Sequence, residues 1–187
     1  MFRRRGLWNL KAQVRPRGRR PLDPRPKGWR EVAALESPVF GISGVEGGEL
    51  AKGLVKALCP EGVILIDALA TGRLERLCKT IQLADCGLVP GGGVENARQE
   101  ISRRTLGVPV FSIGIPTVVD CRALLRYVLG EEGERYEDKL HPYEESLLAT
   151  PRQMGAATDM GAKLIAFSLN KALHGDLSTQ EILKYLY

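Results

Sequence analysis

The stretch Val63-Ile64-Leu65-Ile66-Asp67-Ala68-Leu69-Ala70 decides the fold, because four consecutive aliphatic residues are followed directly by a carboxylate. A continuous apolar run without polar alternation is typical of a strand that is covered on both faces, and such strands occur in mostly parallel sheets. A second apolar run, residues 108–114, is followed by Asp120. The two runs predict an α/β protein, a mostly parallel sheet with helices on each side.

Three acids follow predicted strands. Asp67 ends the first run, Asp85 ends a strand expected over residues 80–85, and Asp120 comes shortly after the run at 108–114. In an open α/β sheet the functional site lies outside the carboxyl ends of the strands. We therefore expect these carboxylates, above all Asp67 and Asp120, to meet in one groove.

Two chemistries suit such a pair. Two carboxylates in a partly desolvated cleft can share one proton, so that one acts as the base that activates water and the other as the acid that protonates a leaving nitrogen. The same acids could instead hold a divalent metal that activates the water. A third interpretation concerns Asp120 alone: it lies in the first turn of a helix predicted over residues 118–129, where a carboxylate complements the helix dipole.

The charge of the chain is unevenly distributed. The chain has 187 residues and a formal net charge of +5, but residues 1–30 contain 11 of the 27 Lys and Arg and one acid, Asp23. We predict that residues 1–30 form a disordered basic tail and that residues 31–187 form one domain of mildly acidic charge. Weak nucleic-acid contact by the tail and a merely solvated extension both remain open.

Composition also limits location and cofactors. Hydrophobic residues make up 44% of the chain, as in an ordinary globular protein, and no apolar run approaches the length of a membrane span. Without a secretion signal, a cytoplasmic location is expected. Four cysteines without a CxxC pair and only two histidines argue against a zinc site, so reduced thiols and no cofactor are expected.

Several further elements can be predicted. Their ranges are a strand at 31–35, helices at 49–58, 69–78 and 150–173, and a short terminal helix that opens with the capping box from Ser178 to Glu181. Thr150-Pro151 is a second helix start, and Leu164 is expected among the core residues of that helix. His174 at the end of the long helix is interpreted as a positive charge partner of the helix terminus. The glycine-rich loop at 90–96 suits a tight turn or a backbone that passes close to a substrate.

Several of these segments together resemble one protein family. They are residues 66–70, Thr80-Ile81-Gln82 with Asp85, residues 90–96, 105–110 and 113–120, and Leu148-Ala149-Thr150-Pro151. In this order, from about Arg30 to Gly175, they closely resemble the spore germination proteases, the endopeptidases that degrade small acid-soluble spore proteins when germination begins.

The resemblance implies a fold and a set of site residues. The implied fold is a three-layer α/β/α sandwich similar to the hydrogenase-maturation peptidases. The implied catalytic residues are Asp67 and Asp120, the location is the spore core, and a homo-oligomer is suggested. We expect substrate-binding or supporting roles for Glu46, Asp85, Gly93, Asn96, Arg98 and Thr117.

The sequence also departs from the family pattern. Family chains are about twice as long, and their N-terminal half has no convincing counterpart in residues 1–30. Gly72 replaces a family arginine, with Arg73 one place later, and the loop at 130–145 is short. The alternative function is therefore a catalytically inactive or truncated peptidase-like binding domain.

Overall fold

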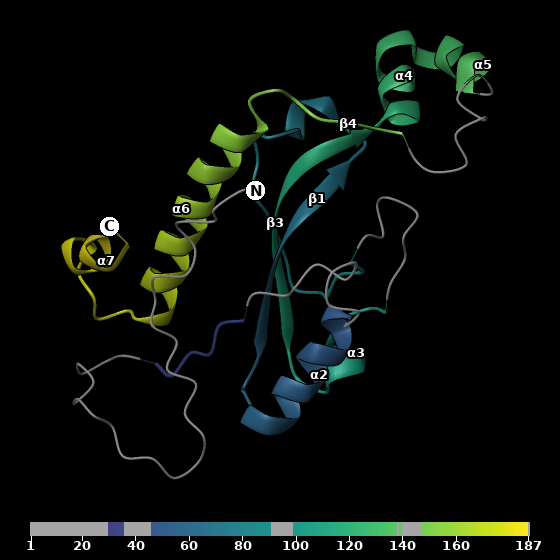
Figure 1. The fold of residues 1–187 in the computed structure, drawn as a ribbon. Coiled ribbons are helices and arrows are strands. Elements are labelled where there is room, and N and C mark those ends of the chain that lie inside the picture. The colour runs from purple at the N-terminus through teal and green to yellow at the C-terminus, as the bar shows by residue number, and fades with distance from the viewer. Residues whose placement is uncertain (1–29, 36–45, 91–98, 138, 140–146, 187) are drawn as a thin grey trace. The chain divides into compact units, whose positions relative to one another are not determined.

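The computed structural model describes residues 30–35, 46–90, 99–137, 139 and 147–186. The chain divides into two compact units, one formed by residues 37–158 and the other by residues 1–36 together with 159–187. The first unit contains the sheet (Figure 1). In chain order the elements of this unit are α2 (Gly47–Leu58), β1 (Val63–Thr71), the 3-10 helix η1 (Leu74–Arg76), β2 (Gln82–Ala84), α3 (Arg103–Leu106), β3 (Val110–Asp120), α4 (Cys121–Leu129), η2 (Gly130–Gly133), α5 (Glu134–Glu137) and β4 (Leu148–Ala149).

The two apolar runs form the two long strands, as predicted. β1 and β3 pair in parallel from Val63 opposite Val110 to Thr71 opposite Val119. Figure 1 shows them as two long arrows that lie side by side. Both strands continue beyond the expected ends, because Ala68 to Thr71 and Ile115 to Asp120 stay extended. The helix expected at 69–78 is therefore wrong: strand β1 occupies its first residues, and only the three-residue turn η1 follows.

The sheet is mixed, so the prediction of a mostly parallel sheet is wrong. β3 is the central strand, and β1 is its only parallel neighbour among the described residues. β2 pairs antiparallel with the first half of β3, where Ala84 lies opposite Ser112, and β4 pairs antiparallel with the end of β3, where Ala149 lies opposite Val119. Since β1 occupies one edge of β3 along its length, β2 and β4 share the other edge at different heights. The coarser prediction, an α/β protein, is confirmed.

A β-bulge interrupts the long parallel pair. Leu69 lies opposite Pro116, but the next residue, Ala70, lies opposite Val118, so Thr117 is the additional residue on β3. Proline has no N–H for a ladder hydrogen bond, and within sheets it is confined to edges and bulges. The carbonyl of Pro116 accepts a hydrogen bond, at 2.7 Å, from the backbone N–H of Cys78, which lies outside the strands. A bulge of this kind locally bends the strand that carries it.

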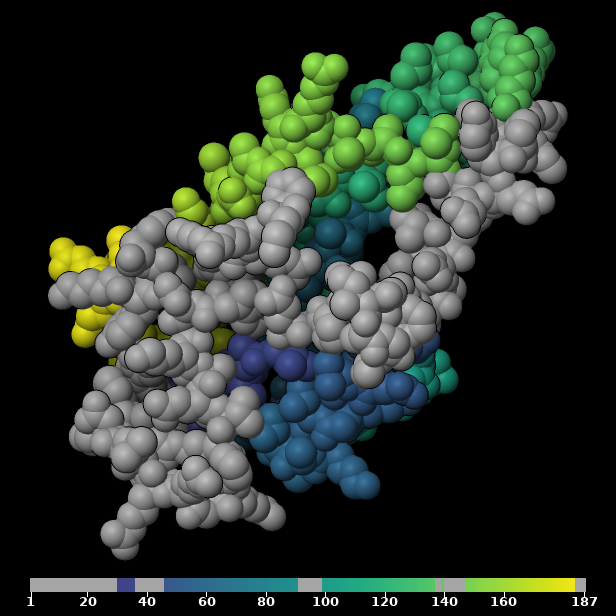
Figure 2. All heavy atoms as spheres, in the orientation of Figure 1, coloured from purple at the N-terminus to yellow at the C-terminus, as the bar shows by residue number. Residues whose placement is uncertain are grey.

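The helices of the first unit lie near the two ends of the long strands. Helix α2 begins near the expected residue, and it lies with α3 near the start of β1 and β3 (Figure 1). At the other end, α4 and α5 lie next to each other, and their green atoms form a continuous surface (Figure 2). Tyr127 and Val128 on α4 are exposed. The strand expected at 31–35 is wrong: these residues have no regular secondary structure.

The second unit contains α7 (Thr179–Leu186) and most of α6 (Met154–Leu173). The predicted capping box is confirmed: Ser178 and Glu181 exchange hydrogen bonds, with Ser178 N donating to Glu181 Oε2 at 2.9 Å and Glu181 N donating to Ser178 Oγ at 3.3 Å. Helix α6 ends at Leu173 as expected. Leu164, expected in its core, is exposed.

His174 is buried, not a charged partner of the helix terminus. Its Nδ1 accepts the backbone N–H of Arg30 at 3.2 Å. Burial, followed by the positive charge of Arg30, lowers the pKa of the imidazole below its usual value. The interpretation as a C-terminal cation is therefore wrong, since the neutral ring is the form that this environment favours.

A lowered pKa at His174 predicts that acid destabilises the protein. Above about pH 6.5, the pKa of an unperturbed histidine, the ring is neutral in both states. Below that pH the unfolded chain takes up a proton that the folded chain resists, so the free energy of unfolding should fall down to the lowered folded pKa. Denaturant unfolding at several pH values should show a steeper loss for the wild type than for His174→Gln. Parallel curves would contradict the pKa shift.

Gly114 allows the close approach of β1 and β3, so alanine at this position should destabilise the sheet. A Cβ atom there would lie 2.4 Å from Leu69 Cγ and 2.8 Å from the backbone oxygen of Asp67. We expect Gly114→Ala to lower the free energy of unfolding by about 1–3 kcal/mol. The matched control is Gly53→Ala in α2, where a Cβ meets nothing within 4 Å and should stabilise the helix by about 0.5–1 kcal/mol. Equal effects in chemical denaturation would rule out the predicted clash.

Candidate active site

Asp67 was expected at the end of a strand, but it lies within β1, four residues before the strand ends at Thr71. Its side chain is exposed. Its Oδ1 accepts the backbone N–H of the next residue, Ala68, at 2.9 Å. An exposed carboxylate that a main-chain donor orients can be reached by a ligand that approaches the strand from solvent.

Asp120 occupies the junction between β3 and α4. It is the N-cap residue of the helix, and its Oδ1 accepts from Arg122 N at 2.8 Å and from Ala123 N at 3.2 Å. These bonds satisfy two of the amides that a helix start leaves without intrahelical partners. The expected helix start at Val118 is therefore wrong by three residues, because β3 continues to the capping residue.

The strand register separates Asp67 from Asp120. Asp67 lies opposite Gly114, and Asp120 follows six residues later on β3. At about 3.3 Å per residue, less the bulge, the two Cα atoms are roughly 15–20 Å apart along the sheet. Carboxylates influence each other's proton strongly only within about 4–6 Å. The register thus does not bring the two carboxylates together in one groove, as the sequence had led us to expect.

Asp85 lies at the opposite end of β3 from Asp120. It follows β2, whose last residue Ala84 lies opposite Ser112 near the start of β3. Because β2 is antiparallel to β3, its carboxyl end points away from the carboxyl end of β3. The three acids therefore lie at three different heights of the sheet.

The supporting residues are scattered over the unit. Glu46 is the N-cap residue of α2 and makes no side-chain cap bond. Thr117 is buried, and its carbonyl accepts a hydrogen bond from Thr150 Oγ1 at 2.8 Å. Thr150 was expected to cap the long helix, but α6 begins only at Met154, so this expectation is wrong. Gly93, Asn96 and Arg98, with most of the glycine-rich loop, lie outside the described residues.

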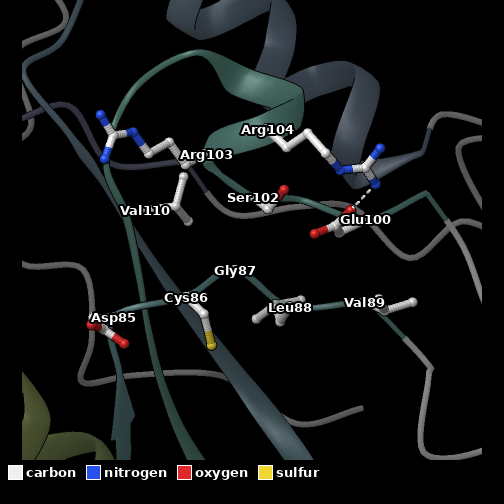
Figure 3. A pocket seen from close by; sticks show the side chains of 10 residues that line it. All are labelled: Asp85, Cys86, Gly87, Leu88, Val89, Glu100, Ser102, Arg103, Arg104 and Val110. Carbon is white, nitrogen blue, oxygen red and sulfur yellow. Dashed lines mark hydrogen bonds and ion pairs between the residues drawn. The ribbon is translucent and has the colours of Figure 1, made fainter.

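An open pocket of about 510 Å³ lies beside Asp85 (Figure 3). Its lining residues are Asp85, Cys86, Gly87, Leu88, Val89, Glu100, Ser102, Arg103, Arg104 and Val110. Arg104 forms an ion pair with Glu100, and its hydrogen bond is the main reason that the pKa of Glu100 is lowered. The sequence did not predict this pocket. A local signal near the pocket is the capping box of α3, formed by Ser102 and Thr105. It is hard to recognise in the sequence, because Thr105 stands where a standard capping box has Glu or Gln.

Metal ligands and thiols were searched for among the described residues. No group of three His, Cys, Asp or Glu side chains that could hold a metal ion occurs in the described ranges. All four cysteines are free thiols, as expected. Burial, and then the neighbouring Asp120, raises the pKa of the Cys121 thiol, so this thiol favours its protonated, weakly nucleophilic form.

This fold and site define an α/β protein with an open mixed sheet among the described residues and an exposed carboxylate on the strand that pairs in parallel with its central strand. The chain belongs to the germination protease family, because residues 23–139 match the family model described as Germination protease. The predicted resemblance is confirmed. No helix in the described part of the chain has both the length and the apolar character to cross a membrane.

Individual relatives carry the same description. The germination protease of Clostridium acetobutylicum is 36% identical over 86% of this chain and 57% of its own length. That of Clostridium perfringens is 33% identical over 84% of this chain and 56% of its own, and that of Oceanobacillus iheyensis is 43% identical over 62% and 33%. The chain thus spans a little more than half the length of the first two relatives.

The capping role of Asp120 predicts a stability change. Asp120→Ala removes both side-chain bonds to the start of α4 and should lower the free energy of unfolding by about 1 kcal/mol. Asp120→Asn is the matched control, because asparagine caps nearly as well without the charge. Denaturant titration distinguishes the two. An alanine variant as stable as the asparagine variant would contradict the capping role.

Proposed function

We propose that the chain provides the catalytic region of a germination protease, a peptide-bond hydrolase in which Asp67 is the principal carboxylate. Membership of the family supports the reaction class. The single observation that favours Asp67 is its position: an exposed carboxylate in the middle of a long strand. The aspartic mechanism and the roles of individual residues are part of this proposal.

In the proposed reaction, Asp67 takes a proton from a water molecule while the water oxygen adds to the carbonyl carbon of the substrate. Collapse of the tetrahedral intermediate breaks the C–N bond, and the proton passes to the departing nitrogen. One carboxylate can act first as base and then as acid in this sequence. The distance along β3 argues against Asp120 as the second member of a proton-sharing pair. Its two backbone bonds favour the capping role instead.

The remaining expectations belong to the same proposal. The substrates are small acid-soluble spore proteins, the location is the cytoplasm of the spore core, and no cofactor is required. The three-layer sandwich similar to the hydrogenase-maturation peptidases, the homo-oligomer and the weak nucleic-acid contact of the basic tail are also proposed. Asp85 and Thr117 are proposed to support substrate binding, as are Glu46, Gly93, Asn96 and Arg98.

A second candidate is a non-catalytic domain that binds peptides. The separation of the acids along the sheet favours it, because peptide hydrolysis by a carboxylate pair needs both groups at one bond. The described residues bring no second acid of the predicted set to the height of Asp67. The two candidates differ in one measurable property, which is turnover of a protein substrate.

Two matched substitutions test the assignment of Asp67. Asp67→Asn removes the base and should lower the rate of cleavage of a small acid-soluble spore protein by about 10²–10⁴-fold. Asp120→Asn keeps the helix cap and should leave the rate within a few-fold. Gel electrophoresis of timed digests measures both, with and without a chelator.

Each alternative gives a different result. An equal loss in both variants would support a pair of catalytic aspartates, Asp67 with Asp120. Loss of activity with the chelator would support metal-assisted hydrolysis. No cleavage by the wild-type chain would support the peptide-binding candidate.

A further inference from the structure

A side-chain amide lies in the same row of the sheet as Asp67. In the central strand β3, Gly114 lies opposite Asp67 of β1 on one side and opposite Gln82 of β2 on the other. Paired residues of neighbouring strands point to the same face of a sheet, so the side chains of Asp67 and Gln82 lie on one face. Across these three strands the row thus consists of a carboxylate, a glycine and an amide, which the sequence did not predict.

The middle of this row is apolar. Gly114 has no side chain, and the side chain of Leu69 occupies the space above it: a Cβ on Gly114 would lie 2.4 Å from Leu69 Cγ and 2.6 Å from Leu69 Cδ1. Leu69 follows Asp67 by two residues and therefore belongs to the same face. In the next row of this face, Ser112 and Ala84 have short side chains. Asp67 and its amide counterpart therefore lie on either side of an apolar stretch of the sheet.

The amide of Gln82 has no partner in the described part of the chain. Gln82 is half-buried, and its side chain forms no hydrogen bond with any residue of that part. An amide donor that is partly removed from water is costly to leave unpaired. A ligand carbonyl that accepts a hydrogen bond from this amide would remove that cost.

The spacing of the row suits one water molecule and one peptide bond. Neighbouring strands lie about 4.8 Å apart, so the Cα atoms of Asp67 and Gln82 are roughly 10 Å apart. Side chains that stand perpendicular to the sheet keep about this separation. A water bonded to a carboxylate, the approach of its oxygen to a carbonyl carbon, and the carbonyl oxygen bonded to an amide together also span about 10 Å. Asp67 can therefore hold the water while Gln82 binds the carbonyl oxygen of the same peptide bond.

We propose that Gln82 is a catalytic residue of this site, whose Nε2–H group donates to the carbonyl oxygen of the peptide bond that is cleaved. This proposal rests on the proposed function and adds a second reacting group to it. Donors aimed at the oxygen where negative charge develops are often the largest single contribution to acyl transfer, and glutamine side chains can supply them.

The donor acts on the oxygen that becomes charged. The water oxygen bonds to the carbonyl carbon while Asp67 takes a proton from the water, and the π electrons of the carbonyl move to its oxygen. Gln82 donates to this negatively charged oxygen. When the C–N bond breaks, the electron pair on the oxygen forms the C=O bond again, and Asp67 gives its proton to the departing nitrogen.

Removal of the donor tests the proposal by kinetics. Gln82→Met keeps the length of the side chain without the N–H group, and it should lower kcat for cleavage of a small acid-soluble spore protein by about 10²–10³-fold. KM should stay within a few-fold, because the donor acts mainly on charge that develops in the transition state. Gln153→Met makes the same exchange at an exposed position before α6 and should leave both constants unchanged. Equal kcat values in the two variants would overturn the proposal.

Nuclear magnetic resonance tests the contact without a substitution at Gln82. The probe is a small acid-soluble spore protein added to the full isotope-labelled chain carrying Asp67→Asn, so that no hydrolysis intervenes. The side-chain amide signal of Gln82, identified through its own backbone resonances, should shift on binding, and that of Gln153 should not. Binding measured by calorimetry without a shift at Gln82 would overturn the contact.

The outcomes separate this proposal from the proposed function. A shift at Gln82 together with a wild-type chain that cleaves nothing would contradict the proposed function alone. Full cleavage by the Gln82→Met variant would contradict the role of Gln82 alone. A wild-type chain that neither binds nor cleaves the spore protein would overturn both.

Discussion

The parallel pairing of β1 with β3 is the constraint on which the rest of the first unit depends. Its register assigns each acid a height on the sheet, since Asp67 lies opposite Gly114 and Asp120 follows the last paired residue. The two strands lie about 45 residues apart in the sequence, and a parallel pair cannot be joined by a tight hairpin turn. The pair is therefore stabilised by contacts along the strands and not by a local turn. Gly114 is part of this constraint because the side chain of Leu69 and the carbonyl of Asp67, both on β1, leave no room for a side chain there.

Sequence signals predicted an element correctly where the residues that carry the signal also form the element. The apolar runs marked the two long strands, and the capping box at 178–181 marked the start of α7. Predictions failed where distant segments decide the outcome. The extension of β1 to Thr71 depends on pairing with β3, and the antiparallel direction of β2, which no periodicity encodes, changed the position of Asp85. One missed feature did have a local signal: Pro116 comes two residues after the run predicted as a strand at 108–114, and a proline within a sheet is confined to edges and bulges.

The two principal acids illustrate how one residue type takes different roles. Asp120 accepts two amides at the start of α4 through its Oδ1 atom. Asp67 accepts the amide of Ala68 and is exposed. Both acids follow apolar runs in the sequence, so the sequence alone does not distinguish them. Their backbone partners differ, and this difference is the basis on which we propose different roles for them.

The proline in β3 has a further consequence for how the sheet can grow. Between β2 and β4, the edge of β3 has Pro116 without an N–H, and the carbonyls of Pro116 and Thr117 already accept from Cys78 and Thr150. A foreign strand that approached this gap would find almost no ladder to join. Within the described part of the sheet, this stretch of the β3 edge is therefore protected against the addition of a further strand by its own proline and by two carbonyls that already accept hydrogen bonds.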